Sequence, residues 1–344
     1  MKKEVQEFDN IKEILYSSAK KYNDHIAFTI KHQNGKEVEY ENKTYTELLN
    51  DVNTLGKALY NLGAKGKRVA IIGKNRYEWV ITHLANLLGG IVSVPLDKDL
   101  QIEELENSLV RSKAEYIVFD SKLTEKMQVI KSANRTNLRE FICMDKVEGF
   151  LSIEELLENG KNIENDEYIK NKIDNNAMEI LLFTSGTTSN AKGVMLNNRN
   201  LAENINAVSA YVKLYPIDML FSVLPLHHCY ESTIGFLLPM ATGASVAICE
   251  GLRYIVPNLQ EAHPTAILTV PLLVESLYKK INEKIVKSKK DKMVNTMISV
   301  TNALKGAGID IKKKVFKEIY DNLGGRLRII VSAAAISWLI VLKK

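Results

Sequence analysis

The sequence has few cysteines and no long apolar run. Cys143, Cys229 and Cys249 are widely spaced, odd in number and without a C-x-x-C partner, which indicates neither a disulfide framework nor a cysteine metal site. The longest apolar candidate is the segment 333–342, which is too short to span a bilayer. The first residues are charged and lack the apolar core of a signal peptide. These absences favour a cytoplasmic protein without a transmembrane segment.

The sequence also has little net charge. Its 46 basic and 41 acidic residues give +5 over 344 residues, and 46% hydrophobic with 25% charged residues is ordinary for a folded protein. The densest basic runs, at 287–292 and 312–314, are typical of a solvated helix face or loop. Neither a zinc pattern nor an aromatic-rich binding motif accompanies them, so we expect no nucleic-acid partner.

Residues 181–196 have the composition of a phosphate-binding loop between two apolar runs. Gly186 and Gly193 permit close backbone approach and positive φ, so that successive N–H groups can converge on an anion. Lys192 adds a point charge. Hydroxyl donors come from Thr184, Ser185, Thr187, Thr188 and Ser189.

This loop differs from a Walker A loop, in which the lysine follows the last glycine and a helix begins. Here Lys192 precedes Gly193, and the next residues, 194–196, have the character of a strand. The sequence therefore predicts a strand-loop-strand grip on phosphate without a helix dipole.

Strand-like and helix-like segments alternate along the chain, which favours an α/β fold with layered, largely parallel β-sheets flanked by helices. The polar segment 160–176 is expected to be an exposed connection before the strand that delivers the phosphate loop. Helices are expected at 11–21, 45–62, 78–88, 102–110, 201–212 and 231–240, with long helical stretches between 269 and 328. Strands are expected at 26–30, 69–72, 91–94, 116–119, 141–144, 220–224, 245–248, 265–269 and 328–331.

The pattern T-S-G-T-T-x-x-x-K-G-V between two strands resembles the signature loop of the adenylate-forming, or AMP-binding, enzymes. Further segments are similar to the long-chain fatty acyl-CoA synthetases of that superfamily, namely 44–48, 67–79, 89–96, 224–231, 263–271 and 324–332. The resemblance implies the large N-terminal domain of the adenylate-forming fold.

The resemblance also implies a chemistry. Such enzymes join a carboxylate to the α-phosphate of ATP, expel pyrophosphate, and transfer the acyl group to the thiol of CoA. Lys192 and the hydroxyl and amide groups of 184–189 and Gly193 would hold the β- and γ-phosphates, and Thr184 would lie near Mg²⁺. The implied partners are ATP, a fatty acid and CoA, with peripheral membrane association as a further expectation.

The same resemblance places His228 beside the acyl pocket and the reacting carboxylate. Because neighbouring residues on a strand point to opposite faces, only one of His227 and His228 is expected to face the site, and we favour His228. Cys229 is expected to be small packing material. Tyr230, Glu231 and Gly235 would lie on the helix that flanks the acyl tunnel.

The helix from 231 is apolar and offers no acidic anchor for an amino group, which favours a medium- or long-chain fatty acid. Adenylation of an aromatic or amino acid remains an alternative, as does a non-catalytic remnant. The whole of 1–344 is expected to be an incomplete large N-terminal domain with an atypical tail at 333–344 and without the small C-terminal domain. We therefore expect the chain to be inactive alone.

Overall fold

The computed structural model describes residues 6–34, 37–184, 192–289 and 291–332. The expectations for Ser185, Gly186, Thr187, Thr188, Ser189 and the tail 333–344 lie outside the described residues. The chain divides into two compact units. The first unit comprises Met1–Ile217 and Pro225–Ile248, and the second comprises Asp218–Leu224 and Cys249–Lys344.

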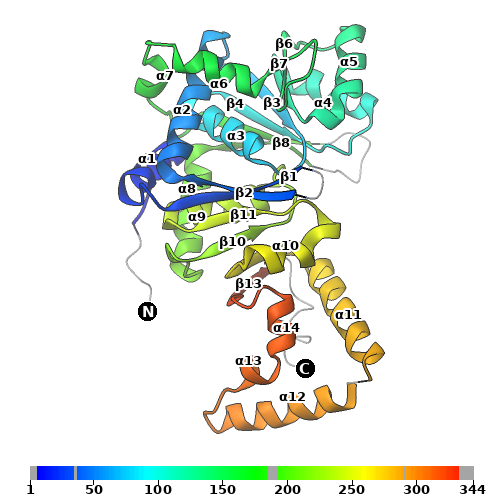
Figure 1. The fold of residues 1–344 in the computed structure, drawn as a ribbon. Helices are drawn as coiled ribbons and strands as arrows, with labels where there is room; N and C mark the ends of the chain where they lie inside the picture. Colours follow the sequence, from blue (N-terminus) through cyan, green and yellow to red (C-terminus); the bar gives the residue numbers. More distant parts are fainter. Residues whose placement is uncertain (1–5, 35–36, 185–191, 290, 333–344) are drawn as a thin grey trace. The chain divides into compact units, whose positions relative to one another are not determined.

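The first unit is built on a seven-stranded sheet with the order β7-β6-β5-β3-β4-β8-β9 (Figure 1). All neighbours are parallel except β8 and β9, which pair antiparallel. The predicted fold class is therefore confirmed. The strands are β3 (Arg68–Ile72), β4 (Val92–Leu96), β5 (Tyr116–Phe119), β6 (Glu140–Cys143), β7 (Leu151–Ser152), β8 (Met178–Thr184) and β9 (Lys192–Asn197).

Helices cover both faces of this sheet. Alternate strand residues such as Ala70 and Ile117 pack into one apolar core with residues of α4 and α5, while α3 packs against β3 and β4 (Figure 1). This alternation follows from the two-residue period of a strand. The helices of this unit are α1 (Ile11–Lys21), α2 (Tyr45–Asn61), α3 (Tyr77–Gly89), α4 (Ile102–Ser112), α5 (Thr124–Ala133), α6 (Ile153–Lys161), α7 (Glu167–Lys170), α8 (Asn198–Tyr211) and α9 (Leu238–Thr242).

A second group of strands belongs to the same unit. β1 (Ile26–Asn34) pairs antiparallel with β2 (Glu37–Thr44) and parallel with β11 (Ser245–Ile248). The sequence did not predict β2, because its side chains are mostly charged or polar and residues 38–42 are exposed. Thr44 then caps α2 through a capping box with Glu47, which explains why the helix begins at Tyr45.

The polar connection 160–176 is not wholly exposed, and that expectation is wrong at α7. Tyr168 is only 1% exposed, and its hydroxyl donates to the carbonyl oxygen of Ala85 at 2.9 Å. A Cβ on Gly56 or on Gly89 would overlap its ring. One aromatic residue therefore fixes this polar segment to the core.

In the second unit, β12 (Ala266–Thr269) pairs parallel with β10 (Met219–Ser222) and with β13 (Ile329–Ser332). Arg328 forms an ion pair with Asp218, which also accepts a hydrogen bond from Thr265. The helices are α10 (Ile255–Ala262), α11 (Pro271–Lys287), α12 (Asp291–Gly306), α13 (Lys312–Val315) and α14 (Lys317–Asn322). The predicted helical stretch between the last two strands is therefore confirmed.

Candidate functional site

One edge of the seven-stranded sheet collects the candidate site residues of the first unit. Because β3, β4, β5, β6 and β8 are parallel, their carboxyl ends lie along one edge, where α/β proteins commonly bind ligands. Polar residues follow each strand there: Asn75 and Arg76 after β3, Asp97 after β4, Asp120 after β5, Asp145 after β6, and Thr184 at the end of β8. The predicted phosphate loop leaves the sheet at this edge.

The β8–β9 hairpin brings Thr184 and Lys192 together. The two residues are register partners, and the hydroxyl of Thr184 lies 3.4 Å from the carbonyl oxygen of Lys192. Both are exposed. The predicted strand-loop-strand arrangement is confirmed, and it places a hydroxyl and an ammonium group at the two ends of the loop.

Gly193 corrects one part of the sequence interpretation. Its backbone is not among the described glycines with positive φ. It lies opposite Phe183 in the hairpin, and a Cβ there would be 3.1 Å from Cδ1 of Leu181. The glycine therefore makes room for a side chain of the facing strand.

Lys192→Ala is expected to weaken ATP binding about tenfold or more, because a charge-assisted contact to phosphate is worth roughly 1.5–3 kcal/mol. Isothermal titration calorimetry with Mg-ATP measures this change. Lys98→Ala is the matched control, because Lys98 is a partly exposed lysine at the same sheet edge and pairs with the neighbouring Asp99. If both variants lose the same ATP affinity, Lys192 would act only through the overall positive charge of the sheet edge and not through a direct phosphate contact.

The two histidines lie in a turn that is fastened to the sheet edge. The backbone N–H of His228 donates to the carbonyl oxygen of Pro225 at 3.1 Å, and that of Leu226 donates to Oδ1 of Asn75 at 3.0 Å. Nε2 of His227 lies 3.7 Å from Oδ2 of Asp97, which is longer than a hydrogen bond. The loop after β3 therefore positions this turn.

The expectation that His227 and His228 point to opposite faces of a strand is wrong, because the turn lets their rings lie together. The ring centroids are 4.2 Å apart at 46°. The side chain of His227 is 12% exposed, and burial, with a smaller effect from His228, lowers its pKa to about 4. His227 is thus neutral at pH 7, whereas His228 is exposed and accessible to a substrate.

The two residues after His228 differ in their exposure to solvent. Cys229 is exposed, so its assignment as packing material is wrong. Tyr230 is half-buried, and burial, followed by the charge of Glu231, raises its pKa to about 12. Its hydroxyl therefore keeps its proton across the neutral range.

The predicted helix at 231–240 is present and begins as a π-helix, Glu231–Leu237, which continues into α9. π-Helical turns are rare and often lie at functional sites. A Cβ on Gly235 would be 2.6 Å from Oε1 of Glu231, so this glycine makes room for the carboxylate. Glu231 is fully buried at the first position of this helix, and the absence of an acidic anchor for an amino group stays a prediction.

Arg76 joins the loops after β3, β5 and β6. Its guanidinium donates two hydrogen bonds of 2.8 Å to the carboxylate of Asp145 and one of 2.6 Å to Glu78, and it lies 3.7 Å from Asp120. These hydrogen bonds lower the pKa of Asp145 to about 2. Local sequence patterns do not predict roles for Arg76, Asn75 or Asp97, because their partners are distant in the chain.

Sequence similarity to known proteins shows the family of this chain. The model of the AMP-binding enzyme family matches residues 15–337. The chain belongs to the AMP-binding enzyme family. Relatives of known name are longer than this chain. It is similar to "Fatty acyl-CoA synthetase B" of Dictyostelium discoideum, at 28% identity over 96% of this chain and 53% of the relative. It is also similar to "Long-chain-fatty-acid--CoA ligase 5" of Rattus norvegicus, at 28% identity over 85% of this chain and 46% of the relative.

Solved structures of AMP-binding enzymes share the fold. A long-chain-fatty-acid-CoA ligase from Archaeoglobus fulgidus superposes with a TM-score of 0.71 at 20% identity, over 81% of this chain and 55% of that chain. A red-emitting luciferase from Phrixothrix hirtus superposes with a TM-score of 0.67 at 19% identity, over 79% and 53%. This chain thus spans about half the length of the relatives it matches.

Proposed function

We propose that this chain carries the phosphate-binding and acid-binding parts of an AMP-forming acid–CoA ligase for medium- or long-chain fatty acids. The observation that supports this most is the shared sheet edge, where the Thr184–Lys192 hairpin and the turn with His228 belong to the same unit. The similarity to fatty acyl-CoA synthetases gives the reaction class. ATP and CoA are the co-substrates in this proposal.

In the first step, a carboxylate oxygen attacks the α-phosphorus of ATP, a P–O bond forms, and the bond to pyrophosphate breaks. Lys192, Thr184 and the loop residues 185–189 would hold the phosphates in line for this displacement. In the second step, the sulfur of CoA attacks the acyl carbon, and AMP leaves as the thioester forms.

A Mg²⁺ ion would neutralise phosphate charge in the first step. The described residues contain no group of three or more histidines, cysteines or acidic residues arranged to hold a metal. Thr184 can contribute only a hydroxyl oxygen, which suits a hard cation that takes its other ligands from phosphates and water. Thr184 is therefore the residue we assign to Mg²⁺.

His228, Tyr230, Glu231 and Gly235 would border the acid. His228 is the accessible histidine, and its ring can donate a hydrogen bond to a carboxylate. The π-helix that follows is fully buried and mostly apolar. We propose that this helix faces the hydrocarbon part of the substrate.

The test uses the chain completed with the C-terminal part of the Dictyostelium relative. Pyrophosphate release should increase from acetate to octanoate to palmitate, because each buried methylene contributes about 0.8 kcal/mol. The 344-residue chain alone is expected to form no acyl-CoA from ATP, Mg²⁺, palmitate and CoA, since it spans about half of its relatives. A preference for anthranilate or an amino acid would favour the alternative substrates. If the completed chain releases no pyrophosphate, the result would favour a non-catalytic remnant. Formation of acyl-CoA by the 344-residue chain alone would contradict its expected inactivity.

We also propose that this otherwise cytoplasmic protein associates peripherally with anionic membranes through the segment 271–322. This segment has twelve lysines and six acidic residues, an excess larger than the net +5 of the whole chain. Its exposed apolar side chains include Leu272, Tyr278, Val286 and Val300. None of the helices in the described part of the chain is long and apolar enough to cross a bilayer.

Co-sedimentation with phosphatidylcholine vesicles tests this association. We expect the chain to sediment with vesicles that contain 30% phosphatidylglycerol, because each lysine near an anionic surface contributes about 1 kcal/mol. We expect no sedimentation with neutral vesicles. Replacing Lys312, Lys313 and Lys314 by glutamate should abolish sedimentation. Equal binding to neutral vesicles, or retention by the triple variant, would contradict the proposal.

A further inference from the structure

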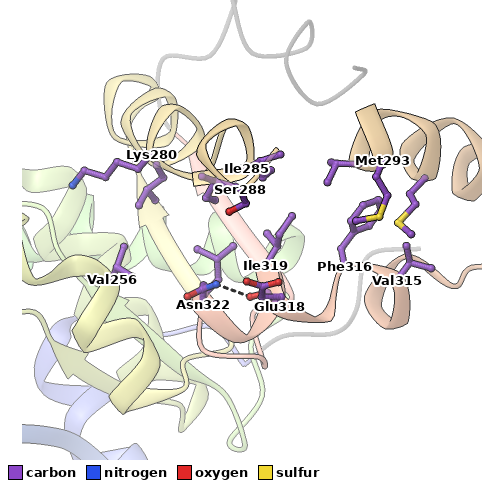
Figure 2. A pocket seen from close by; sticks show the side chains of 15 residues that line it. Val256, Lys280, Ile285, Ser288, Met293, Val315, Phe316, Glu318, Ile319 and Asn322 are labelled. Atoms are coloured by element: carbon purple, nitrogen blue, oxygen red, sulfur yellow. Dashed lines mark hydrogen bonds between the residues drawn. The ribbon is translucent and has the colours of Figure 1, made fainter. Parts of the chain in front are cut away.

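The second unit contains an apolar cavity that the proposed reaction does not use. The cavity has a volume of about 220 Å³ and is lined by residues of α10, α11, α12, α13 and α14. Figure 2 shows that the lining extends from Val256 and Asn322 at one end, past Ile285 and Ile319, to Met293 and Phe316 at the other. No residue that we assign to ATP or to the reacting acid lines it.

The surrounding helices direct apolar faces into this space. Leu277, Ile281 and Ile285 follow one another at intervals of four along α11, and Met293 and Met297 do so along α12. Residues four apart lie on one face of a helix. Each helix therefore presents an apolar stripe to the same cavity.

These helices have almost no closed core of their own. Among the described residues of 271–322, only Leu273 and Thr301 are buried. Helices gain most of their stability by burying an apolar face, so this arrangement leaves that gain incomplete. An apolar occupant would supply the missing contacts.

The chemistry of the lining favours a flexible hydrocarbon chain with an anionic end. Two methionines and Phe316 give an adaptable apolar surface. Lys280 also lines the cavity and is exposed, so it can pair with an anion that stays in water. Glu318 is the one acidic residue of this lining, in a segment with twice as many lysines as acidic residues.

The volume limits the occupant to a single chain. An apolar cavity of roughly 150 Å³ holds benzene, so 220 Å³ corresponds to about nine carbon atoms at the same density. A phospholipid has two chains and would leave one outside. We infer that this cavity binds the hydrocarbon chain of one free medium-chain fatty acid, with its carboxylate near Lys280.

Titration of the 344-residue chain with fatty acids of increasing length, without ATP, gives the first test. Affinity is expected to rise about fourfold per methylene from hexanoate to decanoate and then to level off, since each buried methylene contributes that factor. Ile281→Trp fills the cavity and should weaken dodecanoate binding at least tenfold. Val286→Trp is the matched control, because Val286 lies on the same helix, is 53% exposed and does not line the cavity.

The same titration tests the proposed contact between Lys280 and the carboxylate of the fatty acid. Lys280→Glu should weaken dodecanoate binding several-fold, whereas Lys279→Glu, at the exposed neighbouring position outside the lining, should not. Dodecanol should bind equally to the natural chain and to Lys280→Glu. Equal effects of both lysine variants would remove the carboxylate contact and overturn that part of the inference.

Photo-crosslinking with a diazirine-bearing dodecanoic acid locates the bound chain. Labelled peptides are expected from 277–297 and 315–323, with labelling lost in Ile281→Trp and kept in Lys192→Ala. This last variant separates the cavity from the proposed catalytic function. Labelling confined to the first unit would overturn the inference, as would retention of 277–297 labelling in a folded Ile281→Trp chain. If circular dichroism shows that this variant is unfolded, Met297→Trp decides by the same criteria.

Discussion

Replacing Glu179 by glutamine is expected to stabilise the chain at pH 8 and above and to change its stability little near pH 4. Glu179 lies on β8 and is only 2% exposed. Burial raises its pKa to about 8, and a hydrogen bond with Asn198 opposes this rise only in part. Its Oε2 has no hydrogen-bond partner among the described residues. The charged form of this side chain is therefore poorly accommodated.

The sign of the pH dependence of stability follows from the number of protons that the folded and unfolded chains bind. An unfolded glutamate titrates near 4.5, so between pH 4.5 and 8 the folded chain holds a proton that the unfolded chain has released. The free energy of unfolding must then fall as the pH rises through this window, by up to about 1.4 kcal/mol per pH unit. Above pH 8 the penalty is on the order of 3–5 kcal/mol and no longer grows. Glutamine has the same shape and cannot ionise, so it removes this slope.

Urea unfolding of both chains between pH 4 and pH 9 measures the effect, with the difference between them as the readout. Glu158→Gln is the control, because Glu158 is an exposed glutamate on α6 of the same unit. Parallel pH profiles for the natural chain and Glu179→Gln would contradict the account, since the buried carboxyl would then titrate alike in both states.

Local patterns let the sequence predict the β8–β9 hairpin, because the two apolar runs and the turn residues between them all lie within 181–196. Strands β3, β4 and β5 were also predictable, since they are short apolar runs buried on both faces. β2 was missed because a solvent-facing strand next to β1 needs no apolar pattern. Tyr168 was missed for a related reason, since one aromatic residue in a polar stretch gives no periodic signal.

The histidine turn shows the limit of reasoning by periodicity. Its geometry depends on Asn75, which precedes it by more than 100 residues. No local pattern can predict such contacts. The lysine runs were interpreted correctly as solvated surface, because Lys287, Lys292, Lys313 and Lys314 are exposed. Their position on helices around a cavity could not be predicted from charge alone.

Arg76→Met is expected to lower the free energy of unfolding by about 3–5 kcal/mol, because it leaves the buried carboxylate of Asp120 and the partly exposed carboxylates of Asp145 and Glu78 without their cation. The side chains of Arg76 and Asp120 are only 18% and 4% exposed. Methionine retains the aliphatic packing but removes the hydrogen bonds to Asp145 and Glu78. Arg76→Lys should lose less, since it keeps the charge but not the paired geometry. Urea unfolding at pH 7 measures both.

Acidification gives an independent readout of the same contacts. Asp145 has a folded pKa of about 2 against an ordinary 3.8, so it stabilises the fold above pH 3.8, and this contribution is lost as the pH falls through 2. In Arg76→Met the pKa of Asp145 should return toward its ordinary value, and the loss of stability below pH 4 should be smaller than in the natural chain. Lys170→Met is the control, because the side chains of Lys170 and its partner Asp166 are 79% and 44% exposed, so loss of this pair should cost under about 1 kcal/mol.

Arg76→Met should also affect the candidate site, because Arg76 is adjacent to Asn75, which accepts a hydrogen bond from the turn that contains His228. Loss of the guanidinium should free the loops after β3, β5 and β6 from one another. In the completed chain, Arg76→Met should therefore slow pyrophosphate release with palmitate even where the protein remains folded. If Arg76→Met and Lys170→Met unfold at the same urea concentration, the contacts of Arg76 act as ordinary surface pairs, and another part of the first unit must hold the sheet edge in place.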